Sequence, residues 1–404
     1  PPHPILSGLV GSEMCIRDRN MLTKEFESEL KKWRHDFHAS PELNFDVNQT
    51  AAKVAELLKS FGLEVHTGIG GTGVVGVLKK GSGNKSIGIR ADMDALPITE
   101  LNDFPYKSKN PGKMHACGHD GHTTMALGAA KYLSENGDFN GTAHFIFQPD
   151  EEATEGAQAM INDGLFEKFN IDEVYAFHNL PGLETGNFAS RAGAITGSES
   201  LFEIKLHGRG GHSALPHMGV DTITVGTQII TALQSIVARK INPALNGVVS
   251  VTEFISDGKK NVLPGESIIT GDTRALSLEA NQIIEDSMRQ IVDGIAKAHN
   301  IDYSFSYNVQ TQMTINTPEQ VHAAIDAAKS LVGNDLVDGD CEPKLFSEDF
   351  AQMLLVKPGC YILIGNGTEG NNGKSLHSAD YDFNDDLLVV GSSYWATLVT
   401  KQLA

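Results

Sequence analysis

The sequence predicts an α/β protein in which a second domain is inserted into the first. The apolar runs at residues 74–78 and 87–89 lack polar–apolar alternation, so they predict strands covered on both faces. Past about Asn187 the pattern changes, and residues 201–206 alternate as a strand with one solvated face does. A chain of 404 residues is also too long for one ordinary core, which favours two domains.

The first domain is expected to begin with two helices. From Met21 to Phe37, apolar residues recur three and four positions apart, and Pro41 ends this pattern. A second helix over residues 51–61 stops at Gly62. The expected strands follow at 74–78, 87–89, 143–147 and 174–177, with a helix over 123–133 between the second and third. The last part of the chain predicts helices over 318–332 and 385–398 around a strand at 361–364.

The inserted domain is expected to be ferredoxin-like. Its predicted elements are a strand at 201–206, a helix over 220–237, strands at 248–254 and 268–275, a helix over 278–299 and a strand at 303–309. This order, β-α-β-β-α-β, forms a self-contained layer. We therefore assign residues 21–188 and 310–404 to the first domain and residues 189–309 to the inserted domain. Residues 1–20 show no periodicity and no signal-peptide features, so we expect a non-native or disordered extension.

Composition excludes several classes of partner. Lys and Arg number 32 against 51 Asp and Glu, and the resulting net charge of −19 argues against nucleic acid and anionic membrane surfaces. No apolar run reaches the roughly 18 residues that a membrane span needs. The four cysteines, at positions 15, 117, 341 and 360, are scattered rather than arranged as a disulfide framework. This usage predicts a protein of the reducing cytoplasm.

One short run indicates a metal site. Residues 115–122 contain three histidines, a cysteine and an aspartate. Zn²⁺ accepts imidazole and thiolate in one shell. Cys117 also stands just before a predicted helix, whose positive dipole end favours a thiolate. His115 and His122 are more histidines than such a site requires, and their roles stay open.

Three predicted strands carry ionisable residues just past their carboxyl ends, where open α/β sheets bind ligands. These are the residues 92 and 94 after one strand, Glu151 and Glu152 after another, and His178 after the third. His377 lies in a late loop. Together with Cys117 and His119 these groups suffice for two metal ions and one water, whose pKa such a pair depresses. The adjacent glutamates suit a division into one ligand and one base.

Simpler interpretations compete with this one. A lone histidine is most often structural, Cys117 alone would more often be a small buried hydrophobe, and a glutamate pair is usually surface charge. A cysteine hydrolase with Cys117 as nucleophile is a rival enzyme, but it leaves the glutamates, His178 and His377 without a role. A metal-storing protein without turnover is a second rival. Such a protein would not need a glutamate that acts as a base, so the glutamate pair argues against it.

The motifs also resemble those of a known family, the metal-dependent amidohydrolases of the M20 peptidase group, in the branch with hippurate hydrolase, N-acyl-amino-acid amidohydrolases and auxin-conjugate hydrolases. The resemblance extends from about Trp33 to the end of the chain. It rests on the motifs at residues 90–97, 115–122, 148–152, 177–179, 208–213, 261–265, 272–274 and 376–378.

The resemblance implies a mixed-sheet di-metal hydrolase domain and an inserted lid and dimerisation domain. Zinc is the first choice of metal, with manganese, cobalt or nickel as alternatives. The implied substrates are N-acyl amino acids, with a metallo-dipeptidase or aminopeptidase activity as the alternative, and the implied assembly is a homodimer or higher homo-oligomer. The positions matching metal ligands are Cys117, His119, Glu152, His178 and His377.

The resemblance assigns further roles. Glu151 matches the general base, and Asp94 matches a carboxylate that orients the ligands. In the inserted domain His212 matches a residue that stabilises the developing oxyanion in a partner subunit's site. Asn261 and Arg274 match substrate-binding positions, and an arginine fork suits a substrate carboxylate. Without the resemblance, His212 would read as a turn residue and Arg274 as half of a surface salt bridge.

Overall fold

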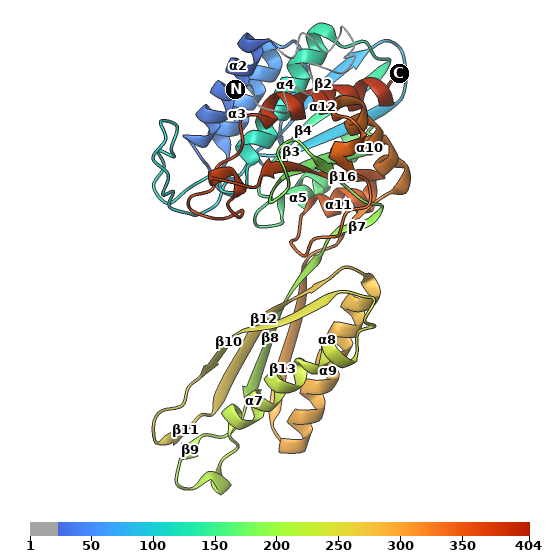
Figure 1. Ribbon diagram of the computed structural model, residues 1–404. Coiled ribbons are helices and arrows are strands. Elements are labelled where there is room, and N and C mark those ends of the chain that lie inside the picture. The colour runs from blue at the N-terminus through green and yellow to red at the C-terminus, as the bar shows by residue number, and fades with distance from the viewer. Residues whose placement is uncertain (1–22) are drawn as a thin grey trace. The chain divides into compact units, whose positions relative to one another are not determined.

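The computed structural model describes residues 23–404 (Figure 1). The expected extension over residues 1–20 and the first two residues of the predicted first helix lie outside this range. The chain divides into two compact units. The first comprises the residues up to Gly193, Ile315–Glu342 and Asp349–Ala404, and the second comprises Ala194–Thr314 and Pro343–Glu348. Sequence analysis places the inserted domain at residues 189–309.

The first unit is built on a mixed eight-stranded sheet in the order β1-β2-β4-β3-β5-β16-β6-β15. Parallel pairing joins β3 to β4, β3 to β5 and β5 to β16, whereas β2 is antiparallel to β1 and β4. Every residue of β3 is buried, as its uniformly apolar pattern predicts. The strands are β1 (Glu64–Ile69), β2 (Gly73–Lys80), β3 (Ser86–Asp92), β4 (Gly141–Gln148), β5 (Glu173–Pro181), β6 (Phe188–Ala189), β15 (Val337–Asp338) and β16 (Gly359–Gly367).

Helices cover both faces of this sheet, with α4 and α12 together on one face and α5 and α11 on the other (Figure 1). The helices are α2 (Lys24–His38), α3 (Asn48–Ser60), α4 (His119–Asn136), α5 (Gly156–Asn162), α6 (Leu165–Lys168), α10 (Pro318–Val332), α11 (Phe350–Val356) and α12 (Leu387–Gln402). Among residues 23–404, none of the helices combines the length and apolar character that crossing a membrane requires.

Helix α4 is buried over most of its circumference, because its small residues pack between α2, α12 and β3. Sequence analysis expects this helix over residues 123–133, yet it begins at His119. The difference arises because apolar periodicity marks only the part of a helix that packs in a core. The polar residues His119, Asp120 and His122 are buried as well, and they form the first turn. The histidine-rich run therefore supplies the start of the helix itself.

A buried charge network holds this first turn in place. The Arg34 side chain, fully buried on α2, donates from Nε to Asp120 Oδ2 at 3.1 Å and pairs with Asp382. His38 Nδ1 lies 2.8 Å from the same Asp120 oxygen, and His38 Nε2 lies 3.2 Å from Glu100 Oε1. Burial lowers the pKa of His38, but its hydrogen bonds to the two carboxylates outweigh that effect and raise it to about 9. Asp120 is thus anchored next to His119.

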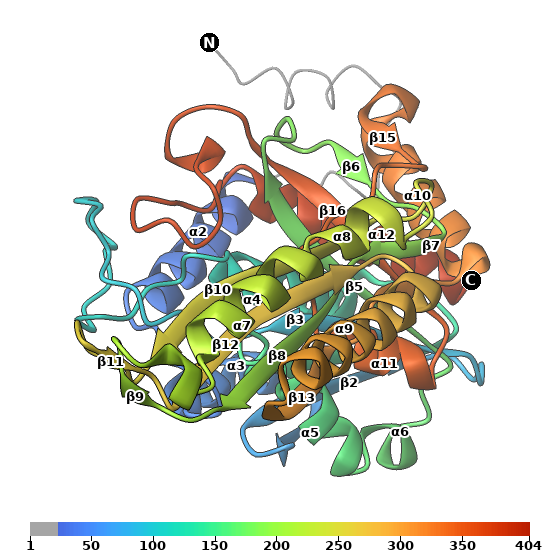
Figure 2. The same ribbon diagram turned by 90° about the horizontal axis from the view of Figure 1, so that it is seen from below.

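The second unit has its main elements in the order strand, helix, strand, strand, helix, strand. Its four-stranded sheet is antiparallel throughout, in the order β10-β12-β8-β13, and α7 and α9 pack on one face (Figure 2). The elements are β8 (Ser198–His207), α7 (Thr222–Leu233), α8 (Ser235–Arg239), β10 (Gly247–Ser256), β12 (Glu266–Ala275), α9 (Leu278–His299) and β13 (Asp302–Thr311). A short ribbon, β9 (Gly211–His212) with β11 (Val262–Leu263), extends from them, and β7 (Gly193–Thr196) and β14 (Thr314–Asn316) lie where the chain passes between units.

Strand direction positions the candidate site in the first unit. Because β4, β3 and β5 are parallel neighbours, their carboxyl ends meet at one edge of the sheet. Asp92 ends β3 opposite Gln148, the last residue of β4, so Asp94 and the Glu151–Glu152 pair follow side by side. His178 lies near the end of β5. Residues that are far apart in sequence are therefore delivered to a common place by backbone pairing alone.

Candidate metal centre

The five side chains predicted as metal ligands lie together in the first unit. Cys117 Sγ is 3.3 Å from His178 Nε2, and Glu152 Oε2 is 3.4 Å from His377 Nε2. His119 Nε2 lies 3.8 Å from Glu152 Oε1. Their ligand atoms form overlapping groups, each within 4.8 Å: Cys117, His119 and His178; Cys117, Glu152 and His377; His119, Glu151 and Glu152.

Two backbone features bring the run at residues 115–122 and the late loop together. Gly118 has φ +100°, a left-handed conformation that turns the chain sharply between Cys117 and the start of α4. His377 also has a positive φ, +65°. Its backbone N–H donates to the carbonyl of Ala116 at 2.8 Å. This hydrogen bond fixes the loop that carries His377 beside the turn that carries the other ligands.

Asp94 organises the site from behind, as a carboxylate outside the ligand set. Its two oxygens accept the backbone N–H groups of Glu151 and Glu152, each at 3.1 Å. Its backbone carbonyl accepts a hydrogen bond from His119 Nδ1 at 2.8 Å. Since a carbonyl oxygen only accepts, this bond places the proton on Nδ1 and directs Nε2 of His119 into the cluster.

The cluster fits divalent metal ions. Within residues 23–404, neither His119 Nε2 nor Glu152 Oε1 has a hydrogen-bond partner, although both atoms are buried. A buried polar atom without a partner is costly, so these two atoms require something between them. Ligands bound at about 2.0–2.3 Å to one tetrahedral ion lie about 3.3–3.8 Å apart. The Cys117–His178, Glu152–His377 and His119–Glu152 distances of 3.3, 3.4 and 3.8 Å lie in this range, and the last is too long for a hydrogen bond.

The pKa shift of Cys117 also favours a bound cation at this site. Burial, reinforced by the nearby carboxylates of Glu152 and Glu151, raises the pKa of the Cys117 thiol well above its usual value. Burial and the negative neighbours therefore disfavour the thiolate that the helix start would favour. A bound cation reverses that balance, since it compensates the charge of the thiolate. Cys117 suits a metal ligand better than a free nucleophile.

The pKa values of the other ionisable groups in the cluster are shifted by burial and by neighbouring charges. Burial lowers the pKa of His119, but the charge of Asp92 and the hydrogen bond to Asp94 raise it to about 10. Burial raises the pKa of Glu152 to about 7. Burial also lowers the pKa of His178 and His377, which keeps both imidazoles neutral and able to bind a metal.

His115 and His122, whose roles sequence analysis left open, differ in their hydrogen bonds. His122 uses both ring nitrogens: Nδ1 lies 2.7 Å from Asp92 Oδ1 and Nε2 lies 2.8 Å from Asn179 Oδ1. Neither ring nitrogen of the buried His115 has a hydrogen-bond partner among the described residues. Burial lowers the pKa of His115 to about 4. Sequence reasoning missed Asn179, whose sole signal was its place beside His178.

The predicted substrate-binding residues lie in the second unit. His212 is exposed on β9 opposite Val262 of β11, and the neighbouring Ser213 N–H donates to the Asn261 carbonyl at 3.1 Å. Arg274 lies on β12 and borders a hollow of about 550 Å³ on the sheet face away from α7 and α9. Its guanidinium donates to Asp272 at 2.7 Å and to Glu199 at 2.6 Å. Arg274 therefore occupies a salt-bridge network on that face.

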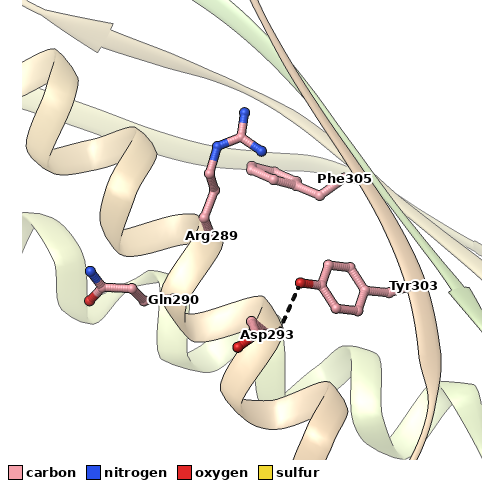
Figure 3. A pocket seen from close by; sticks show the side chains of 5 residues that line it. All are labelled: Arg289, Gln290, Asp293, Tyr303 and Phe305. Atoms are coloured by element: carbon pink, nitrogen blue, oxygen red, sulfur yellow. Dashed lines mark hydrogen bonds between the residues drawn. The ribbon is translucent and has the colours of Figure 1, made fainter.

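Another hollow of about 680 Å³ lies between α9 and β13 of the second unit (Figure 3). Its charged groups are paired locally, with the Arg289 guanidinium 2.7 Å from Glu285 and over the Phe305 ring, and with Tyr303 donating to Asp293 at 3.3 Å. None of the groups of potential metal ligands found within residues 23–404 includes a residue that lines it. This hollow therefore lacks the grouped metal-ligand side chains of the site in the first unit.

Residues 88–401 match the model of Peptidase family M20/M25/M40. The chain belongs to this family. It is 44% identical over 379 residues to a hippurate hydrolase of Campylobacter jejuni subsp. jejuni, covering 94% of this chain and 98% of that protein. It is 40% identical over 308 residues to an N-acyl-L-amino acid amidohydrolase of Geobacillus stearothermophilus, covering 76% and 83%.

Among solved structures, a Bacillus subtilis protein described as a dinuclear metal binding peptidase of the M20 family superposes with a TM-score of 0.83. It is 30% identical, and the match covers 94% of this chain and 99% of that one. The M20 membership predicted from the motifs is thereby confirmed, as is the mixed α/β fold. This M20 protein is a hydrolase that acts on amide bonds.

The close approach at Gly118 leads to a testable prediction. A Cβ at this position would lie 2.2 Å from Asn179 Oδ1, in addition to the strain of φ +100°. Gly118→Ala is expected to lower the free energy of unfolding by clearly more than the roughly 1–2 kcal/mol that left-handed backbone alone costs. Urea denaturation of the metal-free protein measures this loss.

Gly62→Ala is the matched control, because Gly62 has φ +84° and nothing lies within 4 Å of its added Cβ. Gly62→Ala therefore includes the free-energy cost of a left-handed backbone but no steric clash of the added Cβ. Equal losses in the two variants would contradict the importance of the contact between Gly118 and Asn179.

Proposed function

We propose that this protein hydrolyses the amide bond of N-acyl amino acids, using two divalent metal ions held by Cys117, His119, Glu152, His178 and His377. The observation that carries the proposal is the pair of buried, partnerless ligand atoms, His119 Nε2 and Glu152 Oε1, 3.8 Å apart. The 44% identity to a hippurate hydrolase over 94% of the chain supports an N-acyl amino acid as substrate.

The donor set suggests which metal belongs here. One thiol, three imidazoles and one carboxylate suit zinc first, and manganese, cobalt or nickel as alternatives. Divalent ions in such a site polarise a carbonyl oxygen and lower the pKa of water. The chain's own contribution is to hold the ligands, to exclude bulk water through burial, and to provide a group that moves the proton.

Glu151 is the group proposed to move that proton. It is 7% exposed, and its Oε2 lies 3.7 Å from His119 Nε2, so its carboxylate borders the ligands. Its backbone N–H is held by Asp94. In the proposed reaction Glu151 takes a proton from the attacking water and delivers it to the nitrogen of the leaving amino acid as the C–N bond breaks. Asp94 keeps both glutamates in place meanwhile.

The second unit is proposed to bind the rest of the substrate. His212 would stabilise the negative charge that develops on the substrate oxygen, and Asn261 and Arg274 would bind the substrate. Arg274 would exchange one of its present partners, Glu199 or Asp272, for the free carboxylate of the amino acid. The unit as a whole is proposed as the lid and dimerisation domain of a homo-oligomer.

Two other enzyme classes are weaker candidates. A peptidase acting on small peptides uses the same metal chemistry, and a structural relative is described as a peptidase. A cysteine hydrolase requires a reactive thiolate, whereas burial and neighbouring carboxylates raise the pKa of Cys117. The experiments below separate these candidates.

Chelation tests the metal requirement. Exhaustive removal of divalent ions is expected to abolish hydrolysis of hippurate, and added Zn²⁺, Mn²⁺ or Co²⁺ to restore it, measured by release of free glycine. Iodoacetamide treatment of the metal-loaded enzyme is expected to leave activity largely intact, because a coordinated, buried Cys117 is protected. Activity that survives chelation and is lost on alkylation would favour the cysteine hydrolase instead.

Glu151→Gln tests the proton transfer. The variant keeps the size of the side chain but removes the base, so kcat is expected to fall by roughly 10²–10⁴-fold while metal content stays at the wild-type value. Elemental analysis and steady-state kinetics provide the two readouts. Glu155→Gln, an exposed position in the same loop, is the control and is expected to behave as wild type. A fully active Glu151→Gln would remove Glu151 from the mechanism.

A substrate panel distinguishes acylase from peptidase activity. N-acetyl, N-benzoyl and indole-acetyl amino acids are compared with unblocked dipeptides on the metal-reconstituted protein. The N-acyl compounds are expected to have the higher kcat/KM, as the 44% identity to a hippurate hydrolase suggests. A preference for unblocked dipeptides would replace the proposed function with a dipeptidase.

A further inference from the structure

Asn179, which is fully buried at the end of β5, is the neighbour of one ligand and sets its orientation. Its backbone carbonyl accepts a hydrogen bond from Nδ1 of His178 at 2.7 Å. The carbonyl oxygen can only accept, so the proton stands on Nδ1 and the other nitrogen, Nε2, faces Cys117 Sγ at 3.3 Å. The His178 ring is thereby presented to the cluster.

The side chain of Asn179 also supports two further ligands. Its carboxamide oxygen lies close to Gly118, where an added Cβ would be only 2.2 Å from that oxygen. Gly118 is the residue between the ligands Cys117 and His119. The Asn179 carboxamide therefore supports the turn at Gly118, which sets the positions of Cys117 and His119 relative to each other.

Asn179 is itself held from two sides. Nε2 of His122 lies 2.8 Å from its side-chain oxygen and 3.2 Å from its backbone nitrogen. Its side-chain N–H donates to the hydroxyl of Tyr381 at 2.6 Å. Tyr381 is fully buried, and its backbone N–H donates to the carbonyl of Ser378, the residue after His377. The loop of the fifth ligand is thus connected to the same amide.

The His122 ring continues the connection into the sheet. Its Nδ1 lies 2.7 Å from Asp92 Oδ1, and the other Asp92 oxygen accepts from Arg90 at 2.6 Å. All these side chains are buried, so no solvent weakens their hydrogen bonds. A continuous chain of contacts, from Arg90 through Asp92, His122 and Asn179 to Tyr381, joins β3, α4, β5 and the late loop.

We infer that His122 and Asn179 are positioning residues that set the spacing and orientation of the metal ligands, with His122 acting through Asn179. The inference rests on the proposed function, because it assumes that the cluster binds metal. His122 forms a group of potential metal ligands with Asp92 and His119, but Asp92 and Asn179 engage both of its nitrogens, so we place it outside the ligand set. Outer residues of this kind typically change metal affinity by about 10–100-fold.

Two substitutions of His122 separate its two contacts. The amide of asparagine reaches about as far as Nδ1 of histidine, so His122→Asn keeps the contact with Asp92 and loses the one with Asn179. Glutamine reaches about as far as Nε2, so His122→Gln keeps the contact with Asn179. Metal affinity is measured by competition with a chromogenic chelator, and ligand geometry by the absorption bands of the Co²⁺-loaded protein, including the thiolate-to-cobalt band.

The expected result is that His122→Asn weakens Co²⁺ binding about 10–100-fold and alters the bands, whereas His122→Gln stays within about threefold of wild type. His144→Asn is the matched control, since His144 is also buried, on β4, but is absent from the groups of potential metal ligands. It is expected to bind Co²⁺ as wild type does. Tyr381→Phe removes only the hydroxyl that holds Asn179, and about tenfold weaker binding is expected; it decides the question if His122→Asn does not fold.

The outcomes separate this inference from the proposed function. Wild-type protein that binds no divalent ion would overturn both. Wild-type protein that binds Co²⁺, together with a folded His122→Asn of unchanged affinity and spectrum, would overturn the inference alone. Equal losses in His122→Asn and His122→Gln would also overturn it, because the contact with Asn179 would then not matter. Tyr381→Phe with wild-type affinity and bands would do the same.

Discussion

The crowding of buried acids around His119 is the constraint on which the rest of the site depends. Asp92, Asp94, Glu151 and Glu152 converge there with the thiol of Cys117, and Asp92 and Asp94 are fully buried. Like charges in a poorly solvated place repel strongly, so such a cluster persists only with compensating positive charge. The Arg90 guanidinium compensates the charge of Asp92, and the His119 imidazole, whose pKa is raised, compensates part of the remaining negative charge. Divalent ions would complete the compensation, which explains why ligand atoms are left without hydrogen-bond partners.

Rigid surroundings keep this unfavourable arrangement in place. Parallel pairing of β3 with β4 and β5 delivers the acids and His178 to one edge. The network of Arg34, Asp120 and His38 anchors the first turn of α4 from the opposite side. His119 lies in the first turn of the buried helix α4 and His178 lies on the buried strand β5, and a hydrogen bond to Nδ1 orients each of these two rings. Such support is what a preorganised metal centre requires.

The two units contribute different kinds of chemistry. The first unit holds the complete set of proposed ligands and the proposed base, of which Cys117, His119, His178 and Glu151 are buried, whereas His377 is exposed in its loop. The second unit carries the residues proposed to hold the substrate: His212 is exposed on a two-residue strand, and Arg274 is engaged by Asp272 and Glu199. The proposed metal ligands are therefore already close together, whereas the proposed substrate binding would require Arg274 to exchange one of its present partners.

By itself, the sequence determined the α/β class, the order of the main elements, the M20 family and the identity of the metal-site candidates. Uniformly apolar runs predict buried strands, and the ionisable residues of the site directly follow these runs in the sequence. Only the tertiary structure decided what each histidine of the run at residues 115–122 does. Apolar periodicity could not reveal that α4 begins at His119, because its first turn is polar yet buried. Nor could local sequence assign His122 to Asn179 and Asp92, or show that burial disfavours a free Cys117 thiolate. These features depend on distances between residues remote in the chain, which folding alone sets.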